Sequence, residues 1–195
     1  MVIASNNLNK IKQFQEILPD YNVRGLRDMN INIDIPETGT TFEENSYIKA
    51  REIFNITHDS VLADDSGLCI ELYDNWPGVN THRCLGDNAS ATDINNYILE
   101  RMKSVSYKDR ACMSVCVITL IDKSGKAYVF RGELKGHVSK EIRGLNTFGY
   151  DDIFELDNGK TMAELANAEK YEISARAKAV AQFKEFVKQN KNIEL

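Results

Sequence analysis

Four acidic residues of this sequence have the chemistry to bind a divalent metal ion together: Glu37, Glu44, Asp64 and Asp65. Glu37 follows an alternating apolar run, Glu44 lies on the helix predicted after it, and the two aspartates follow another short apolar run. Carboxylates from separate segments suit Mg²⁺, which takes one or two of them and completes its shell with water and substrate phosphate oxygens. The alternative is that residues 64–67 form a plain turn and that both glutamates are solvated.

A polar loop near the N-terminus has the chemistry to bind phosphate. Between an apolar run and a helical pattern, the chain reads Ser5-Asn6-Asn7-Leu8-Asn9-Lys10. Backbone N–H groups at the positive end of a helix attract phosphate, and the Lys10 ammonium adds a point charge. Ser and Asn are also ordinary helix N-caps, so the loop fits a simple cap as well as a phosphate site.

Three further cations lie on predicted helices. Lys49 comes five residues after Glu44, about 140° further round the helix, so the two side chains are not neighbours but both can border a cleft. Lys170 and Arg176 lie near the start of the last helix. For all three residues, ordinary surface charge is the alternative to a role in a site.

Two aromatic residues alternate with glycine in residues 144–151. Phe148 and Tyr150 can stack on a base there, while backbone groups and Asp151 read its polar edge. The alternative is a glycine turn that packs both rings into the core, and the local sequence fits the two interpretations equally.

The apolar patterns predict the elements that position these residues. Strands are expected over residues 2–4, 31–35, 61–63, 112–121 and 127–130, the last two joined by a hairpin turn at 122–125. Helices are expected over residues 11–18, 41–56, 92–103 and 173–187, with capping-box spacing at 41–44 and 161–164. Interleaved helices and strands predict an α/β fold, a two-lobed mixed-sheet sandwich with flanking helices, forming a single domain over residues 1–195.

The composition argues against several protein classes. A net charge of −5 and a pI near 5.3 disfavour nucleic acid as a partner. The four cysteines form no CxxC pair and the three histidines are scattered, which disfavours zinc; Cys112 and Cys116 are expected to pack as small hydrophobes in a reducing compartment. The apolar N-terminal run is too short for a signal peptide and no apolar stretch approaches 18 residues, so we expect a cytoplasmic protein without a membrane partner.

The order and wording of several segments are similar to one known family. The matching stretches are residues 5–10, 37–45 with 49–50, 63–68, 77–79, 148–151, and 160–165 leading to 169–170. They resemble the inosine triphosphate pyrophosphatase family, also called the Ham1 family. The resemblance implies a central nucleotide-binding cleft, a homodimer, and Mg²⁺-dependent hydrolysis of nucleoside triphosphates such as ITP, dITP and XTP to a monophosphate and pyrophosphate.

The resemblance also implies residue roles. Asp65, Lys49 and Lys10 would be catalytic, with Asp65 orienting or deprotonating the attacking water and the lysines neutralising phosphate charge. Glu37 and Asp65 would bind the metal. The triphosphate would be held by Ser5, Asn6, Asn7, Asn9 and Lys10. The nucleoside would be contacted by Ser66, Phe148, Gly149, Tyr150, Asp151, Lys170, Ala175 and Arg176.

This chain departs from the family pattern at several positions. Ala175 stands where relatives usually have a histidine that reads the base, and His82 stands where they usually have alanine. Thr147 and Asp152 replace a usual glycine and proline. We therefore expect weaker preference for ITP and XTP over ATP and GTP, with His82 either compensating or simply exposed.

Two other functions compete with the nucleotide-hydrolysing enzyme. One is a catalytically silent nucleotide-binding module that kept the pocket for sensing, against which the intact acids and lysines speak. The other is a nucleic-acid-binding protein with stacking aromatic residues, which the net negative charge disfavours. A variant of the main hypothesis keeps the hydrolysis of nucleoside triphosphates but shifts the base preference.

Overall fold

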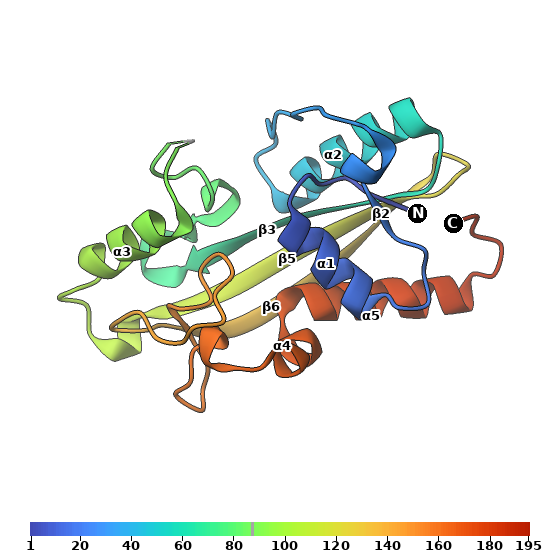
Figure 1. Cartoon of the computed structure of the whole chain (residues 1–195). Helices are drawn as coiled ribbons and strands as arrows, with labels where there is room; N and C mark the ends of the chain where they lie inside the picture. Colours follow the sequence, from blue (N-terminus) through green and yellow to red (C-terminus); the bar gives the residue numbers. More distant parts are fainter. Residues whose placement is uncertain (87) are drawn as a thin grey trace. The chain divides into compact units, whose positions relative to one another are not determined.

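A mixed sheet of seven strands runs through the residues that the computed structural model describes, 1–86 and 88–195 (Figure 1). Its strands are β1 (Val2–Ile3), β2 (Arg24–Gly25), β3 (Val61–Ile70), β4 (Trp76–Pro77), β5 (Ala111–Ile121), β6 (Ala127–Val138) and β7 (Phe154–Glu155). Their order is β2-β1-β3-β5-β6-β7, with β4 paired to β3. Strand β1 pairs in parallel with β2 and β3, whereas the β3–β4 and β6–β7 pairs are antiparallel. With its helices, this sheet confirms the α/β class.

The chain divides into two compact units. Unit 1 comprises residues 1–65, 116–132 and 176–195, and unit 2 comprises residues 66–115 and 133–175. Helices α1 (Leu8–Ile17) and α2 (Phe42–Thr57) belong to unit 1, and α3 (Ala91–Arg101) and α4 (Asn167–Ile173) belong to unit 2. Helix α5 (Ala175–Gln189) belongs to unit 1 from its second residue onward.

In unit 1, α2 covers one face of the sheet, while α1 and α5 cover the other (Figure 1). Ala50 and Ile53 of α2 are fully buried against the apolar side chains of β1 and β3. On the opposite face, the Phe183 ring of α5 lies 5.9 Å from the Phe130 ring of β6 and 5.6 Å from Tyr21, which follows α1. Packing on both faces buries strands β1 and β3 in unit 1.

Side-chain caps fix where the two helices of the N-terminal half begin. Thr41 caps α2 by accepting from the Glu44 backbone N–H at 3.1 Å, and the Glu44 carboxylate accepts in return from the Thr41 N–H at 3.2 Å. The Asn7 side chain caps α1 by accepting from the backbone N–H groups of Asn9 and Lys10. Reciprocal caps satisfy backbone donors that the first turn leaves free, so the expected capping box at residues 41–44 is confirmed.

In unit 2, α3 packs on an apolar cluster that includes Leu68 and Ile70 of β3 and Phe154 of β7. Arg110, which precedes β5, is almost fully buried beside this cluster. Its guanidinium donates to the Met102 carbonyl at 2.6 Å, to the Val138 carbonyl at 2.7 Å and to the Ser139 carbonyl. Arg110 thus connects the segment after α3 to the end of β6.

The strand predicted over residues 31–35 is wrong. Ile31, Ile33 and Ile35 do pack against the apolar cluster of unit 1, and the residues between them are exposed. No strand is assigned to these residues, and the Ile33 carbonyl accepts from the Asn6 side chain at 3.2 Å. The alternating burial arises here because an extended segment lies across the core. An alternation of apolar and polar residues therefore does not by itself require that the segment pairs with another strand.

The alternative of a plain turn at residues 64–67 is also wrong. Strand β3 continues through these residues to Ile70, and every residue of β3 except Ser66 is buried. Asp and Gly favour turns when their side chains are solvated. Here the carboxylates of Asp64 and Asp65 are paired with buried cations, which allows the extended strand to continue.

The C-terminal helical pattern is interrupted. The helix expected over residues 173–187 is α5, which begins at Ala175, because Ser174 has φ −59° and ψ 155° and separates it from α4, which ends at Ile173. The capping box at 161–164 is present but opens a 3₁₀ turn, Met162–Glu164. Strand β6 extends beyond the predicted residues 127–130 to Val138, after a turn in which Gly125 adopts φ 83°.

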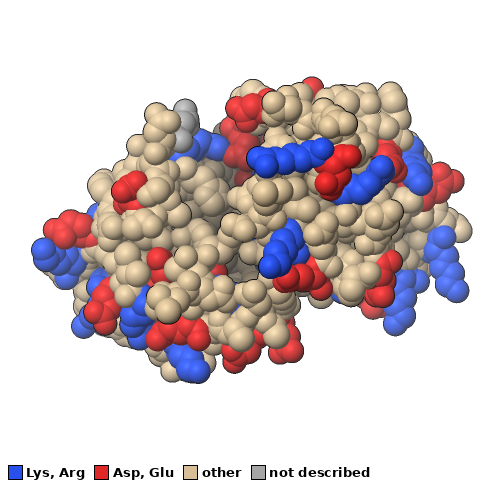
Figure 2. Space-filling view, in the orientation of Figure 1, with Lys and Arg blue, Asp and Glu red and all other residues tan. Residues whose placement is uncertain are grey.

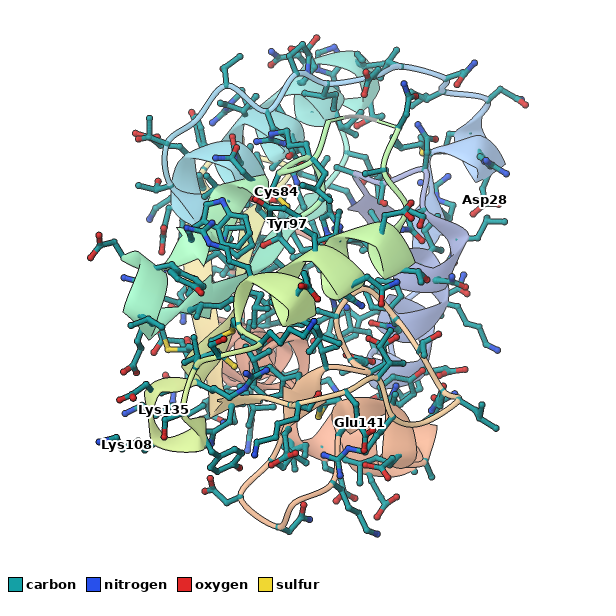
Figure 3. All side chains as sticks on the ribbon, turned by 90° about the vertical axis from the view of Figure 1, so that its left-hand side faces the viewer. Asp28, Cys84, Tyr97, Lys108, Lys135 and Glu141 are labelled. Carbon is teal, nitrogen blue, oxygen red and sulfur yellow. The ribbon has the colours of Figure 1, made fainter. Side chains whose placement is uncertain are left out.

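Many charged side chains are exposed to solvent. On the face drawn in Figure 2, basic and acidic residues are interspersed rather than gathered by sign. In Figure 3, Lys108 and Lys135 of unit 2 lie at the edge of the view, and both side chains, like that of Glu141, are exposed. Cys84, Cys112 and Cys116 are free cysteines, and burial raises the pKa of the Cys116 thiol to about 12. Among the described residues, the helices are too short or too polar to cross a bilayer.

Candidate active site

The ammonium of Lys49 is the centre of a buried cluster in unit 1. Its Nζ atom donates to Glu37 Oε1 at 2.6 Å and to Asp65 Oδ1 at 3.2 Å. Lys49 comes from α2, Asp65 from β3, and Glu37 from the segment that leads into α2. The structure therefore brings together three of the residues that the sequence predicted for metal binding and catalysis.

Asn45 fixes the other side of the Asp65 carboxylate. This fully buried side chain donates through Nδ2 to Asp65 Oδ2 at 3.2 Å and accepts the Gly39 backbone N–H on Oδ1 at 2.8 Å. A Cβ atom on Gly39 would lie 2.6 Å from Glu44 Cβ and 2.7 Å from Asn45 Oδ1, so glycine is required for this approach. Asn45 thereby connects Asp65 to the loop that carries Glu37.

A second group of buried charges surrounds Asp64. Lys10 Nζ lies 3.2 Å from each oxygen of the Asp64 carboxylate, and Arg176 Nη2 donates to Oδ2 at 2.8 Å. Arg176 also donates through Nη1 to the Gln13 side chain of α1. The structure thus places Arg176, which was predicted to line the nucleoside site, beside Lys10 and Asp64 in unit 1.

The adjacent aspartates have opposite electrostatic environments. Burial alone would raise the pKa of Asp64, but Lys10 and Arg176 hold that pKa far below its ordinary value. Burial raises the pKa of Asp65, and Glu37 adds to this while Lys49 opposes it. Burial disfavours the Lys49 charge, yet the carboxylates around it raise the pKa of Lys49 above its ordinary value. The single Lys49 ammonium balances only one of the two carboxylate charges of Glu37 and Asp65. This group therefore keeps a net negative charge that attracts a further cation.

The loop of residues 5–10 is held by its own side chains. Ser5 Oγ accepts from the Asn7 N–H at 3.1 Å, and Asn7 Oδ1 accepts from the Asn9 and Lys10 N–H groups at 3.0 and 3.3 Å. Asn6 donates to the Ile33 carbonyl. The N-cap interpretation is therefore confirmed, and the phosphate role of this loop stays a prediction.

One acid of the candidate metal set belongs to the helix cap instead, and sequence reasoning missed one amide in this part of the chain. Glu44 is not part of the acidic cluster, because its carboxylate accepts from Thr40 and Thr41 in the helix cap. Asn45 was not assigned a role, although it lies four residues before Lys49 and so shares its face of α2. That spacing was the signal available in the sequence.

Unit 2 holds a separate polar group among the residues predicted to contact the nucleoside. Lys170 Nζ donates to Asp151 Oδ2 at 2.7 Å and to the Asn146 carbonyl. The Tyr150 hydroxyl donates to the Gly67 carbonyl at 3.0 Å, and its ring packs against the apolar cluster. Lys170 thus connects the 146–151 loop to α4, and Tyr150 connects the same loop to β3.

The remaining predicted residues of unit 2 differ in accessibility. Ser66 and Phe148 are half-buried, Ala175 is buried, and His82 is exposed on the turn after a short 3₁₀ helix, Gly78–Asn80. Asp152, which departs from the family pattern, accepts from Asn95 at 2.7 Å. Asn95 also donates to the Gly149 carbonyl at 2.9 Å, so this substitution has a structural role.

The donor set of unit 1 fits Mg²⁺. Glu37 and Asp65 offer hard carboxylate oxygens within 3.2 Å of one Nζ atom. In the described part of the chain, no group of three or more His, Cys, Asp and Glu is arranged to hold a metal ion. A site with two carboxylates suits Mg²⁺, whose other ligands are commonly waters and substrate phosphates.

Comparisons with known proteins agree with the resemblance. Residues 1–186 match the Ham1 family. The chain is 37% identical over 190 residues to a dITP/XTP pyrophosphatase of Thermoanaerobacter sp. (strain X514), covering 96% of each chain. It is 36% identical over 194 residues to a dITP/XTP pyrophosphatase of Staphylococcus aureus (strain MW2), covering 99% of this chain and 98% of that one. The solved structure of the Staphylococcus aureus Ham1 protein matches with a TM-score of 0.86 at 36% identity, over 96% of this chain and 97% of that one. This chain belongs to the Ham1 family.

Proposed function

We propose that this chain hydrolyses dITP, ITP and XTP to the nucleoside monophosphate and pyrophosphate, by attack of water on the α-phosphorus with Mg²⁺ bound. The observation that carries the proposal is that Asn45 and Lys49 both donate to the Asp65 carboxylate, while Lys49 also donates to Glu37. The pyrophosphatase activity is supported by relatives named dITP/XTP pyrophosphatases, which are 36–37% identical over nearly the whole chain.

The side chains of unit 1 have separate tasks in this reaction. Asp65, held on one oxygen by Asn45 and on the other by Lys49, orients the attacking water and accepts its proton. The water oxygen bonds to the α-phosphorus while the bond from that phosphorus to the bridging oxygen breaks, and pyrophosphate departs. Lys10 and Lys49 stabilise the negative charge that develops on the departing phosphates.

The metal would be held by Glu37 and Asp65, whose excess negative charge over the single Lys49 ammonium favours a cation. When bound, Mg²⁺ polarises phosphoryl oxygens and neutralises their charge. The loop of residues 5–10 is proposed to contact the phosphates through Ser5, Lys10 and the asparagine side chains.

Seven residues of unit 2 are proposed to contact the nucleoside: Ser66, Phe148, Gly149, Tyr150, Asp151, Lys170 and Ala175. Ala175 offers no hydrogen bond to a base edge, and one lost hydrogen bond of this kind costs about 1–3 kcal/mol of discrimination. We therefore propose that base selectivity is relaxed in this chain while the chemistry is retained.

The assembly of the protein is part of the same proposal. The two units are proposed to act together as one pyrophosphatase domain over residues 1–195, and the central nucleotide-binding cleft implied by the resemblance stays a prediction. A homodimer is also expected from the resemblance. Sedimentation equilibrium of the full chain tests the dimer, because a single species at the monomer mass would exclude it.

The test of the proposed activity is pyrophosphate release from dITP by the unmodified chain and by Asp65→Asn. Removing this carboxylate charge should lower kcat about 100-fold or more while nucleotide binding stays measurable, because proton acceptance and metal binding are both weakened. Asp20→Asn, an exposed aspartate after α1, is the matched control. If the unmodified chain binds dITP without releasing pyrophosphate, the silent nucleotide-binding module is correct instead.

A further inference from the structure

Asp64 lies next to the proposed metal ligand Asp65, yet it contacts a different set of partners. Its carboxylate is 2% exposed and lies between two cations from distant segments, Lys10 of α1 and Arg176 of α5. Lys10 Nζ lies 3.2 Å from both oxygens, and Arg176 Nη2 lies 2.8 Å from Oδ2. The side chains of Lys10 and Arg176 are themselves only 13% and 9% exposed.

These contacts leave Asp64 little capacity for a metal ion. A carboxylate offers about four acceptor positions, and Lys10 and Arg176 already contact both oxygens of Asp64. A divalent cation at these oxygens would also meet two positive charges within about 3 Å of them, which is electrostatically unfavourable. Asp65 differs, because its two oxygens contact one cation, Lys49, and the neutral amide of Asn45.

The same contacts explain what the carboxylate does for its partners. A lysine side chain has four rotatable bonds and many conformations, and a fixed counter-charge restricts them. Without Asp64, Lys10 and Arg176 would be two neighbouring cations with little access to water, and each would move toward solvent or another acid. The position of the Lys10 ammonium therefore depends on Asp64.

We infer that Asp64 is a positioning residue that holds Lys10 toward the triphosphate and couples it to Arg176, and that it is not a metal ligand. The inference rests on the proposed function, because it assigns Lys10 to the phosphates. This role of Asp64 differs from that of Asp65, which is proposed to bind the attacking water and the metal. Lys10 and Arg176 share one carboxylate, so a change at Asp64 alters both residues at once.

The experiment compares Asp64→Asn, Asp64→Glu and Asp65→Asn in dITP hydrolysis at a series of Mg²⁺ concentrations. For Asp64→Asn we expect KM for dITP to rise about 10-fold or more, as for the loss of a charge-assisted hydrogen bond, with half-saturating Mg²⁺ unchanged within about twofold. Asp64→Glu keeps the charge, so its KM for dITP should rise less than that of Asp64→Asn. Asp65→Asn should instead lower kcat and raise the Mg²⁺ requirement.

A binding measurement keeps the inference testable if the proposed activity fails. Calorimetric titration of inorganic pyrophosphate in EDTA should give about 10-fold weaker binding for Asp64→Asn than for the unmodified chain. Lys10→Met should weaken binding similarly, and the double variant should bind no more weakly than Lys10→Met, because Asp64 acts through Lys10.

Several results would overturn the inference. Half-saturating Mg²⁺ that rises 10-fold or more in Asp64→Asn, with KM for dITP unchanged, would make Asp64 a metal ligand. Additive losses in the double variant, or unchanged pyrophosphate binding by a folded Asp64→Asn, would exclude action through Lys10. If Asp64→Asn does not fold, Asp64→Glu decides, since it must raise KM without changing the Mg²⁺ requirement.

Discussion

Lys49→Met should destabilise unit 1 in a way that Mg²⁺ partly reverses. The substitution keeps the length and most of the volume of the side chain but removes the ammonium that contacts Glu37 and Asp65. Removing one partner of a buried ion pair costs about 3–5 kcal/mol. The Glu37 side chain is 25% exposed and recovers some hydration, so we expect a loss of about 3 kcal/mol, at the low end of that range.

Thermal and urea denaturation in EDTA measure this loss. For a chain of this size, about 3 kcal/mol corresponds to a decrease in Tm of about 6–12 °C. Mg²⁺ at ten times its Kd would restore about 1.4 kcal/mol to the variant, because it binds the carboxylates that the ammonium no longer neutralises. The unmodified chain should gain less from Mg²⁺ alone, since Lys49 already occupies these oxygens.

Two variants serve as controls for this prediction. Lys12→Met removes a lysine from α1 whose side chain is 68% exposed, and its Tm should change little. Lys49→Arg keeps the charge and should retain more of the stability than Lys49→Met. The reasoning is refuted if Lys49→Met loses less than about 1 kcal/mol, or if Mg²⁺ stabilises it no more than the unmodified chain.

Three further outcomes follow from the site. Gly39→Ala would place a Cβ atom 2.6 Å from Glu44 Cβ and 2.7 Å from Asn45 Oδ1, so it should cost about 1–3 kcal/mol in urea denaturation and lower the rate of pyrophosphate release; unchanged stability and rate would contradict it. Because the folded pKa of Asp64 is depressed, its contribution to stability is present above about pH 4 and is lost as the pH falls below that value, so unfolding curves from pH 5 to 2.5 should be flatter for Asp64→Asn; parallel curves would contradict the pairing. Ala175→His should raise the ratio of kcat/KM for ITP to that for ATP by about 5-fold or more, unless the unmodified chain already rejects ATP by about 1,000-fold.

Local signals in the sequence predicted the beginnings of the helices well. Thr41 and Glu44 form the expected reciprocal cap, and the polar residues before α1 supply its N-cap through Asn7. Such caps depend on residues within one turn of each other, so spacing along the chain is sufficient to predict them. The same locality explains why the turn between β5 and β6 was predicted correctly around Gly125.

The parts that were missed depend on contacts between distant residues. Asp64 lies 54 residues from Lys10 and 112 from Arg176, and these cations permit a buried extended strand at residues whose types also fitted a turn. The alternation at residues 31–35 correctly predicted which side chains face the core. Strand pairing also requires a neighbouring strand, which the alternation cannot predict. The roles of Glu37, Lys49 and Asp65 came from the family resemblance, and the structure brings the three side chains into contact.

The most direct test of the central claim is hydrolysis of dITP in ¹⁸O-labelled water, with mass analysis of both products. Attack on the α-phosphorus predicts one labelled oxygen in the nucleoside monophosphate, unlabelled pyrophosphate, and no turnover in EDTA. Label in the pyrophosphate, release of single phosphate, or equal rates in Mg²⁺ and EDTA would contradict the account.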